Sequence, residues 1–599
     1  MRTAQAFLPA RSRIRAWLRL RRPRGLDVVN TLIAGLIGAG IGSVVLLLSR
    51  LARLSQKLLL GIVFHNRDAL DVTLELMRFA PGFLVGALAC GVGFWLASRF
   101  ARDVVDVIEA NALHGGNIPF RSSLAFALLS ALAVGTGASV GQEGGSTQLA
   151  GALASWVANL IKLDRRTRRV FVAAGAAAAI TALFDAPIAG TLYALELVLG
   201  GYAVRAAPIV GAAAAGSALA TGLLGGENQP FAAMPASVGP INFIAALPLG
   251  LLAAIAGIAM MQATPLVENS LRRLRIPAWL RPLAISALLI PLLFMVPAAA
   301  GSGHRTLTFL LNVDLPVSVV LGLFLAKSIA TALSLGAGFK GGMFSASLFV
   351  GGCLGGLFAH LAPHLLPSAT APDGVAMVVI GMAAMAASVI GAPFAIVALA
   401  IETTGNLDLA PMAIIGVAIA STVTTMFFGY NFATWRFHLR GLSVRGPYDV
   451  GRLAAHHVQD IVDGSITRLH VDADLAAMTE ATGRPSGLIA VLDRQGRPLN
   501  LIHRQALRMA LEAAPERLEA TGLLAGEPPP SIETTAPLNA FVRMLDRTNS
   551  HLAMVVDPLS GSFIGLAREE DALKRLLATM EAIRQDDLGP APAARPERA

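Results

Sequence analysis

The chain carries little charge for its length. Of its 599 residues only 14% are Asp, Glu, Lys or Arg, and the mean hydropathy is +0.63, whereas soluble domains have about 25% charged residues. Residues 341–372, 374–401 and 409–435 contain no charged residue at all, and each segment exceeds the roughly 20 residues that cross a bilayer. The composition therefore excludes a soluble globular protein and predicts a multi-pass membrane protein.

Cysteine is scarce as well. Cys90 and Cys353 both lie in apolar sequence, so we expect neither a disulfide framework nor a thiolate metal site. His360 and His364 are one helical turn apart, but the chain has no His-Glu-x-x-His run, which a zinc hydrolase of that kind needs. We therefore expect no enzyme activity, no metal and no resident cofactor.

The basic residues that give the net charge of +10 stand at the ends of apolar runs. Seven arginines lie between residues 11 and 24, and four lie between residues 165 and 169. Loops rich in Lys and Arg remain on the cytoplasmic side of a membrane. This pattern predicts a cytoplasmic N-terminus and a lipid bilayer as partner, in a bacterial-type inner membrane. It gives no reason to expect nucleic-acid binding.

Glycine and proline are frequent, and they break the apolar runs. Val28–Leu48 and Phe79–Ala97 are predicted to span the membrane, with an amphipathic segment between them at Leu51–Leu76. Breaks follow at residues 115–119 and 135–137. Broken helices at membrane depth are tolerated where they line a protected cavity, and they indicate a transport site. A mere membrane anchor would not need them.

An internal repeat accompanies these breaks. Ala186-Pro187 precedes Glu196 by the same interval as Ala392-Pro393 precedes Glu402, and residues 141–151 align with residues 342–352. Duplicated membrane units of this kind are common among transporters.

Glu143 stands among glycines, directly before the apolar run 149–160. The start of such a helix exposes backbone N–H groups, and its dipole favours an anion. A carboxylate at this place would occupy the anion's own site. We therefore hypothesise that Glu143 is a movable plug in an anion pathway; the alternative is an ordinary acidic residue in a first helical turn.

Beyond Trp435 the sequence becomes charged enough for a soluble domain. Residues 488–507 parallel residues 552–573, and each copy predicts a strand, a turn, a strand and a helix. Residues 588–599 are rich in Pro, Ala and charge and are predicted to be disordered.

Taken together, these residues resemble the CLC family of chloride channels and chloride/proton antiporters over about residues 30–440. Three family motifs occur in order, at Gly115–Pro119 (GGNIP), Gly141–Gly145 (GQEGG) and Gly341–Ala346 (GGMFSA). Phe184–Pro187 and the Ala392-Pro393 pair with Glu402 also fit. The C-terminal part resembles the paired CBS domains that many family members carry.

The resemblance implies an all-α polytopic membrane protein of two inverted repeats with broken helices, plus a C-terminal soluble α/β (CBS-like) domain. The implied domains are a basic cytoplasmic arm (1–27), the transport domain (28–440), a cytoplasmic CBS-like pair (441–587) and a disordered tail (588–599). The expected partners are a second copy in a homodimer, chloride and protons.

In this family, the residue that matches Glu143 is the gating carboxylate of the anion pathway. The resemblance implies an anion site lined by Gly116, Asn117, Ile118, Gly144, Met343 and Phe344. It also implies an aromatic side chain there, from Trp435 or Tyr430.

Two departures from the family pattern affect the predicted function. Gly116 replaces the family's serine, and Leu197 stands where antiporters carry a second, inward-facing glutamate; Glu196 before it is expected to be structural. Leucine cannot relay a proton, although water could reach Glu143. Three functions remain open: chloride/proton antiport, a passive voltage- or pH-gated chloride channel, and transport of another anion such as fluoride or nitrate.

The CBS-like part departs from its family as well. CBS pairs often bind adenine nucleotides, but the usual Gly-x-x-Thr-x-x-Asp ending has become Asn500, His503 and Ala506 in the first copy, and Ala567 replaces the threonine in the second. We expect no strong nucleotide binding. Dimerisation and regulation both remain open roles for this part.

Overall fold

The computed structural model describes residues 23–61, 76–100, 104–225, 239–365, 372–440, 456–513, 528–548, 550–575 and 578. Most of the predicted basic arm and the whole predicted tail 588–599 lie outside these residues. The chain divides into two compact units, Met1–Tyr448 and Asp449–Ala599.

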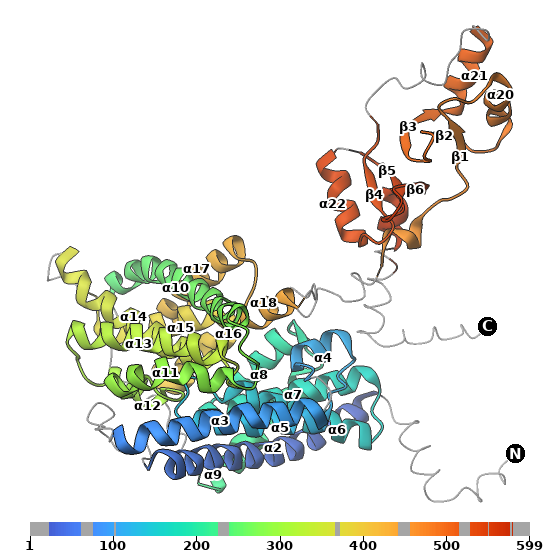
Figure 1. The fold of residues 1–599 in the computed structure, drawn as a ribbon. Coiled ribbons are helices and arrows are strands. Elements are labelled where there is room, and N and C mark those ends of the chain that lie inside the picture. The colour runs from blue at the N-terminus through green and yellow to red at the C-terminus, as the bar shows by residue number, and fades with distance from the viewer. Residues whose placement is uncertain are drawn as a thin grey trace, which may run out of the picture. The chain divides into compact units, whose positions relative to one another are not determined.

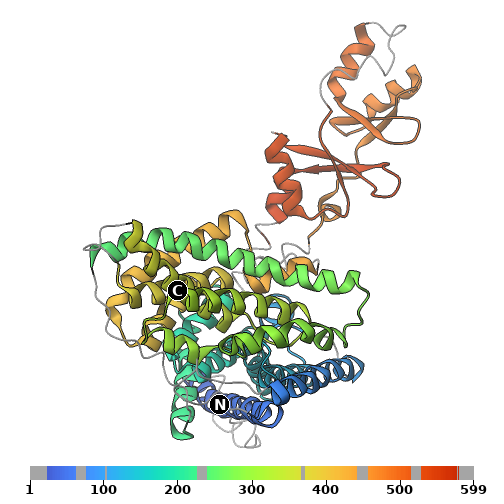
Figure 2. The ribbon, with the colours of Figure 1, turned by 60° about the vertical axis from the view of Figure 1, so that its left-hand side comes forward.

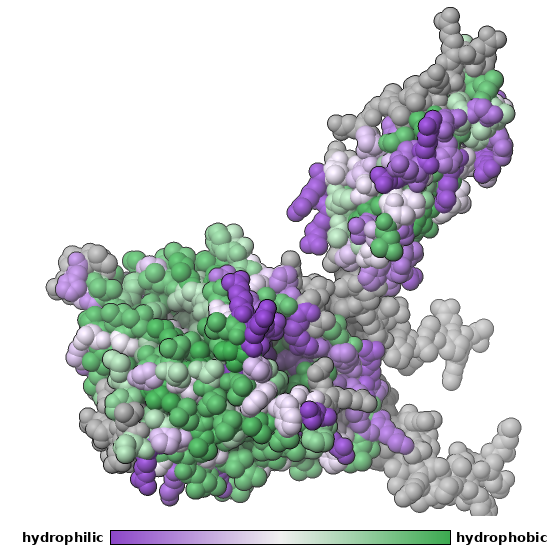
Figure 3. Space-filling model, viewed as in Figure 1, coloured by the Kyte–Doolittle hydropathy of each residue, from purple (hydrophilic) through white to green (hydrophobic). Residues whose placement is uncertain are grey.

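The first unit is helical (Figure 1). Seven of its described helical segments are long and apolar enough to cross a membrane, and apolar residues cover most of the face of this unit seen in Figure 3. The helices are α2 (Pro23–Leu60), α3 (Leu76–Phe100), α4 (Val107–Leu113), α5 (Phe120–Gly135), α6 (Glu143–Leu160), α7 (Arg165–Phe184), α8 (Pro187–Tyr193), the π-helical turn η1 (Ala194–Leu199), α9 (Ala207–Leu223), α10 (Pro240–Arg273), α11 (Arg281–Met295), η2 (Pro297–Ala299), α12 (His304–Leu310), α13 (Val317–Gly336), α14 (Phe344–Leu365), α15 (Gly374–Ile390), α16 (Pro393–Thr404), η4 (Leu407–Leu409), α17 (Ala410–Phe427) and α18 (Phe432–Leu439).

The first spanning helix is longer than the sequence predicts. α2 continues past Leu48 to Leu60 without a break, because the following segment is amphipathic and still packs. Ala52 and Leu60 are buried, while Leu54 and Leu58 are exposed. The predicted end at Leu48 is therefore wrong, and residues 62–75 of the amphipathic segment Leu51–Leu76 lie outside the described residues.

The membrane unit contains two inverted halves, α4–α9 and α12–α17, beside α2, α3, α10, α11 and α18. Corresponding helices have the same boundary signals: Asp164 caps α7 and Asp373 caps α15 through their side chains. Each of these helices ends in a left-handed residue, Asp185 or Gly391, directly before an Ala-Pro pair. The halves meet in an antiparallel bridge, a contact that a two-fold rotation leaves unchanged.

Small residues allow the helices of each half to approach closely. α14 and α15 cross at Gly351 and Gly381, where a Cβ on either glycine would collide with the backbone of the other helix. Without a hydrophobic force between helices in lipid, such close backbone packing holds membrane helices together. The duplicated helices are therefore rigid supports for the breaks between them.

The second unit contains two three-stranded sheets (Figure 2). In each sheet the first strand pairs in parallel with the second, and the second pairs antiparallel with the third. The elements are η5 (Val458–Ile461), β1 (Thr467–His470), α20 (Leu475–Gly483), β2 (Leu488–Leu492), β3 (Pro498–His503) and α21 (Arg504–Ala513), then β4 (Ser531–Glu533), α22 (Leu538–Thr548), β5 (Leu552–Val556) and β6 (Phe563–Arg568).

The predicted repeat of strand, turn, strand and helix is confirmed in both copies. β2, β3 and α21 form the first, and β5, β6 and the helical residues 569–575 form the second. Each copy also begins with a strand and helix that the repeat did not reveal. Buried side chains from both sheets, including Leu492 and Met554, pack together.

Candidate functional site

Two helices of opposite halves begin at the same place. Gly141 donates its N–H to the Gly342 carbonyl (2.9 Å), and Gly342 donates to the Gly141 carbonyl (2.8 Å). α6 starts at Glu143 and α14 at Phe344, just beyond this bridge. The contact requires glycine, because a Cβ on Gly341 would lie 2.6 Å from the Cβ of Val140. The positive ends of two helix dipoles thus converge beside Glu143.

The Glu143 side chain is buried, with 3% of its surface exposed. Its Oε1 accepts a hydrogen bond from the Ser345 hydroxyl and lies 3.7 Å from Nε2 of His304. Ser345 Oγ and His304 Nε2 are themselves 2.7 Å apart. Oε2 has no hydrogen-bond partner among the described residues. A buried carboxylate oxygen without a partner is costly.

Glu143 lines a cavity of about 550 Å³. The cavity runs between α4, α5, α6, the α8–η1 segment, the α13–α14 break and α18. Its wall includes, among others, Asp106, Ile108, Ser122, Phe126, Glu143, Gly144, Thr147, Tyr193, Leu197, Lys340, Met343, Phe344, Phe432, Arg436, Phe437 and Arg440. The wall thus contains both polar and apolar side chains.

Basic side chains make part of the cavity electropositive. Lys340, Arg436 and Arg440 all line it, and Lys340 Nζ also lies 4.1 Å above the ring of Phe94. Asp106 is the only acidic residue besides Glu143 among the described lining residues, and its side chain caps α4 by accepting from Ile108 N (2.9 Å). Such a cluster of cations raises the local anion concentration.

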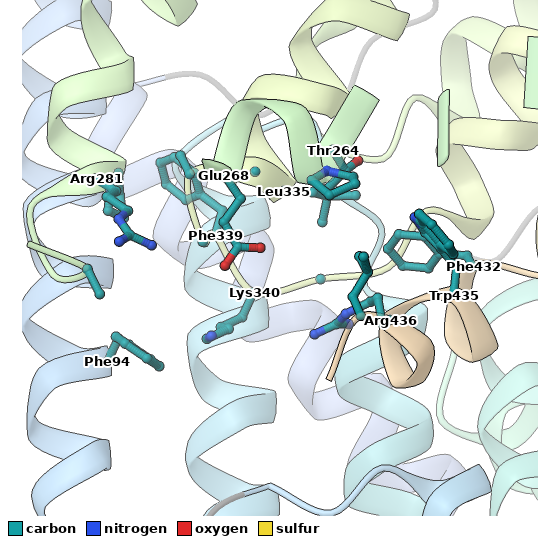
Figure 4. Close-up of a pocket in the computed structure, with 18 of the residues that line it drawn as sticks. Phe94, Thr264, Glu268, Arg281, Leu335, Phe339, Lys340, Phe432, Trp435 and Arg436 are labelled. Carbon is teal, nitrogen blue, oxygen red and sulfur yellow. The ribbon is translucent and has the colours of Figure 1, made fainter. Parts of the chain in front are cut away.

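A smaller pocket of about 210 Å³ adjoins the cavity and shares Lys340 and Arg436 with it. Figure 4 shows Glu268 and Arg281 in this side pocket together with those two cations, and Trp435 and Phe432 at its other end. The side pocket does not include Glu143.

Four of the sequence-predicted site residues share the cavity: Glu143, Gly144, Met343 and Phe344. They come from the two halves, and the aligned segments 141–151 and 342–352 account for all of them. The repeat in the sequence is therefore the pattern that locates this part of the site.

Gly116, Asn117 and Ile118 are not among the described residues that line the cavity, and their place at an anion site stays a prediction. Their segment follows α4. The N–H of Gly116 donates to the carbonyl of Ala110, and this hydrogen bond closes the C-terminal end of α4. The N–H of Ile118 bonds Ser155 Oγ at 3.1 Å. The negative end of a helix, with its N–H groups already bonded, does not suit an anion.

Trp435 and Tyr430 are not among the described residues that line the cavity either, and their role at an anion site stays a prediction. Trp435 lies in the side pocket, and both rings stack on His438. The aromatic hydroxyl in the cavity belongs to Tyr193, whose ring centroid is 6.2 Å from that of Phe344. Tyr193 is one helical turn before Leu197, and this spacing could have identified it.

The membrane unit matches a protein-family model. Residues 85–425 match the family described as voltage-gated chloride channel. The chain belongs to the CLC family of voltage-gated chloride channels. One relative, the voltage-gated ClC-type chloride channel ClcB of Citrobacter koseri, is 30% identical over 351 residues, which are 57% of this chain and 82% of that protein.

Solved structures of CLC proteins share the fold. A slow cyanobacterial Cl⁻/H⁺ antiporter superposes with a TM-score of 0.59 at 20% identity, over 70% of this chain and 98% of that chain. A eukaryotic CLC transporter superposes with a TM-score of 0.59 at 17% identity, over 91% of this chain and 98% of that chain. The second match extends beyond the membrane unit.

Proposed function

We propose that this protein transports chloride across the membrane through the cavity, and that Glu143 is the gate. The observation that carries the proposal is the position of the Glu143 carboxylate at the joint start of α6 and α14, in the wall of an electropositive cavity. Convergent helix N-termini bind anions, and a negative side chain there competes with them.

The gate works by exchange of one negative charge for another. While the ionised carboxylate occupies the site, it excludes chloride. When Glu143 takes up a proton or swings away, the N–H groups at the two helix starts become available to chloride. Because backbone dipoles bind an anion less firmly than an ion pair does, the bound chloride can leave again.

Proton coupling is the finer part of the proposal. Leu197 lines the cavity at the place where antiporters of the family carry a second glutamate. The cavity nevertheless contains Asp106 and Tyr193 beside Glu143, so polar groups extend from the gate to the basic end. We propose chloride/proton exchange; a passive channel is the alternative.

Reconstitution into liposomes distinguishes the two. Vesicles with an outward chloride gradient are monitored with a chloride electrode and an internal pH dye at the same time. Exchange predicts that protons move against their own gradient while chloride runs down. Chloride flux that never moves protons would identify a channel, and no chloride flux would refute the proposed function. Replacement of chloride by nitrate or fluoride in the same vesicles tests the preferred anion.

We further propose a homodimer with both termini in the cytoplasm. Ile188 and Phe394 support an interface within the membrane, because they occupy equivalent positions in the two halves and are each 60% exposed. Light scattering of the purified protein, corrected for detergent, would give twice the chain mass for a dimer and once the chain mass if the proposal is wrong.

The CBS-like pair is proposed to stabilise or regulate this dimer without tight nucleotide binding. Asn500, which stands in the degraded motif, is buried, and its Oδ1 bonds the N–H of Leu501 at 2.8 Å. Calorimetric titration with ATP should show no binding at micromolar concentrations; saturable heat would contradict this.

A further inference from the structure

Two polar residues of the other half contact the Glu143 carboxylate. Ser345, in the first turn of α14, donates its hydroxyl to Glu143 Oε1. His304, at the start of α12, places Nε2 2.7 Å from Ser345 Oγ. Neither Ser345 nor His304 is among the described residues that line the cavity. The carboxylate therefore lines the cavity and also touches a pair of groups that can both give and accept protons.

His304 connects the buried pair with the surface. Its side chain is 31% exposed, whereas Ser345 and Glu143 are buried. The ring is held by an edge contact with Phe184, with centroids 5.2 Å apart. A partly exposed imidazole in direct contact with a buried hydroxyl has the arrangement of a proton entry point, because an imidazole can both accept and donate a proton.

Lys327 fixes the segment that carries His304. It is fully buried in α13 and donates to the carbonyls of Gly301 (2.6 Å) and Ala299 (3.1 Å). Gly301 and Gly303 both have positive φ, at 60° and 81°, so the chain turns sharply before α12 begins. The lysine ties this turn to α13, and its place makes it a positioning residue for the imidazole.

We propose that His304 and Ser345 form a proton relay to Glu143; this rests on the proposed role of Glu143 as gate. The imidazole takes up one proton from water and becomes imidazolium. Its Nε2 proton passes to Ser345 Oγ while the serine's own proton passes to the Glu143 carboxylate. One proton has then entered, Glu143 is neutral, the imidazole is neutral again and Ser345 keeps a hydroxyl.

One buried cation faces both ends of the relay. Lys327 from α13 interacts electrostatically with both His304 and Glu143. When charged, it disfavours the imidazolium and also stabilises the ionised Glu143 carboxylate, so it does not by itself direct the proton from one group to the other. Arg305, the next residue of α12, adds positive charge in the same turn. The Ser345 hydroxyl from α14 and the Phe184 ring from α7 also face His304.

The test uses two variants of the relay in full-length protein, His304→Gln and Ser345→Ala, reconstituted as above. Both should lower proton flux and flatten the pH dependence of chloride flux, with proton delivery slower by about tenfold or more. Ser345→Thr keeps the hydroxyl and should retain proton delivery. His360→Gln is the matched control, because His360 is a similarly exposed histidine in α14 that contacts the carbonyl of Leu315.

A double variant separates relay from packing. In a Glu143→Gln background the group that accepts the proton is gone. Adding His304→Gln should therefore change neither the proton flux nor the chloride flux further. A purely structural His304 would lower chloride flux in both backgrounds, and this would overturn the relay. Wild-type rates and pH dependence in His304→Gln and Ser345→Ala would overturn it as well. If the wild type moves chloride without protons, the relay is tested by the pH dependence of chloride flux, which both single variants should flatten. Absence of all chloride flux in the wild type would refute the proposed function and not the relay.

Discussion

Glu196 and Glu402 each cap the start of a helix in the opposite half. The Glu196 carboxylate accepts from the N–H groups of Phe394 (3.2 Å) and Ala395 (2.8 Å) at the start of α16. Glu402 accepts from those of Ile188 (2.9 Å) and Ala189 (2.7 Å) at the start of α8. The expected structural role of Glu196 is confirmed by these bonds, and the repeat interval in the sequence reflects this exchange.

Glu196→Gln should therefore lower stability and leave transport chemistry intact. A neutral amide still occupies the place, but the charge-assisted bonds to two N–H groups weaken, at a cost of about 1–2 kcal/mol. The melting temperature of the detergent-purified protein should fall, while the ratio of proton to chloride flux stays as in the wild type. Loss of proton flux at an unchanged melting temperature would make Glu196 a proton carrier.

Asp106→Asn should increase chloride flux at low chloride. The substitution removes a negative charge from a cavity that holds three cations, and asparagine caps a helix as well as aspartate does. Flux below saturation should rise by up to about tenfold, because the local potential concentrates the anion. Asp164→Asn, at the cap of α7, is the control and should change nothing. An unchanged flux in Asp106→Asn would place Asp106 outside the ion's path.

Tyr193→Phe should weaken chloride binding. The ring lines the cavity beside Phe344, and its hydroxyl is a donor in a site that lacks the family's serine. Loss of one hydrogen bond of about 1 kcal/mol corresponds to about fivefold in Kd, measurable by calorimetric titration with chloride. Tyr202→Phe is the matched control, since Tyr202 donates to Glu196. Equal affinities in wild type and Tyr193→Phe would show that the hydroxyl does not contact the anion.

The C-terminal unit should loosen in acid through Asp463. The hydroxyl and N–H of Ser465 bond Asp463 Oδ1 and hold the pKa of that carboxyl below its ordinary value of 3.8. A lowered pKa in the folded state adds stability above the ordinary value, and this stability is lost as the pH falls through the folded pKa. The Asp463 backbone also exchanges hydrogen bonds with Leu566, so the amide protection of Leu566 should fall in acid.

Ser465→Ala checks this assignment. Without the hydroxyl, protection of the Leu566 amide should be lost at a higher pH than in the wild type, as measured by hydrogen exchange on the full-length protein. Identical acid profiles would show that Asp463 does not control this junction.

The sequence predicted the helix starts that recur in both halves. It did not predict features that depend on which end of a helix a residue occupies. Glu143 and Phe344 were found because their segments align between the halves, and both segments begin helices. The motif match at Gly115–Pro119 could not place these residues relative to the cavity, because residue letters alone do not tell whether a glycine pair precedes or follows a helix. Here the pair follows α4, while the opposite end of α4, at Asp106, faces the cavity.

Ser345 and His304 could not have been assigned from the sequence. They lie 202 and 161 residues beyond Glu143 in the chain, and only the meeting of α6, α12 and α14 brings the three side chains together. Lys327 was equally hidden, because a lone lysine in an apolar run gives no sign of the carbonyl groups that it binds.

The measurement that tests the role of Glu143 most directly compares Glu143→Gln with the wild type and with Glu402→Gln in chloride-loaded liposomes, recording proton and chloride flux together. Glutamine is a permanent mimic of the protonated carboxyl. The account predicts that Glu143→Gln still conducts chloride, moves no protons and no longer responds to pH, while Glu402→Gln keeps the wild-type ratio. A Glu143→Gln protein with wild-type proton movement and pH response would contradict the gate.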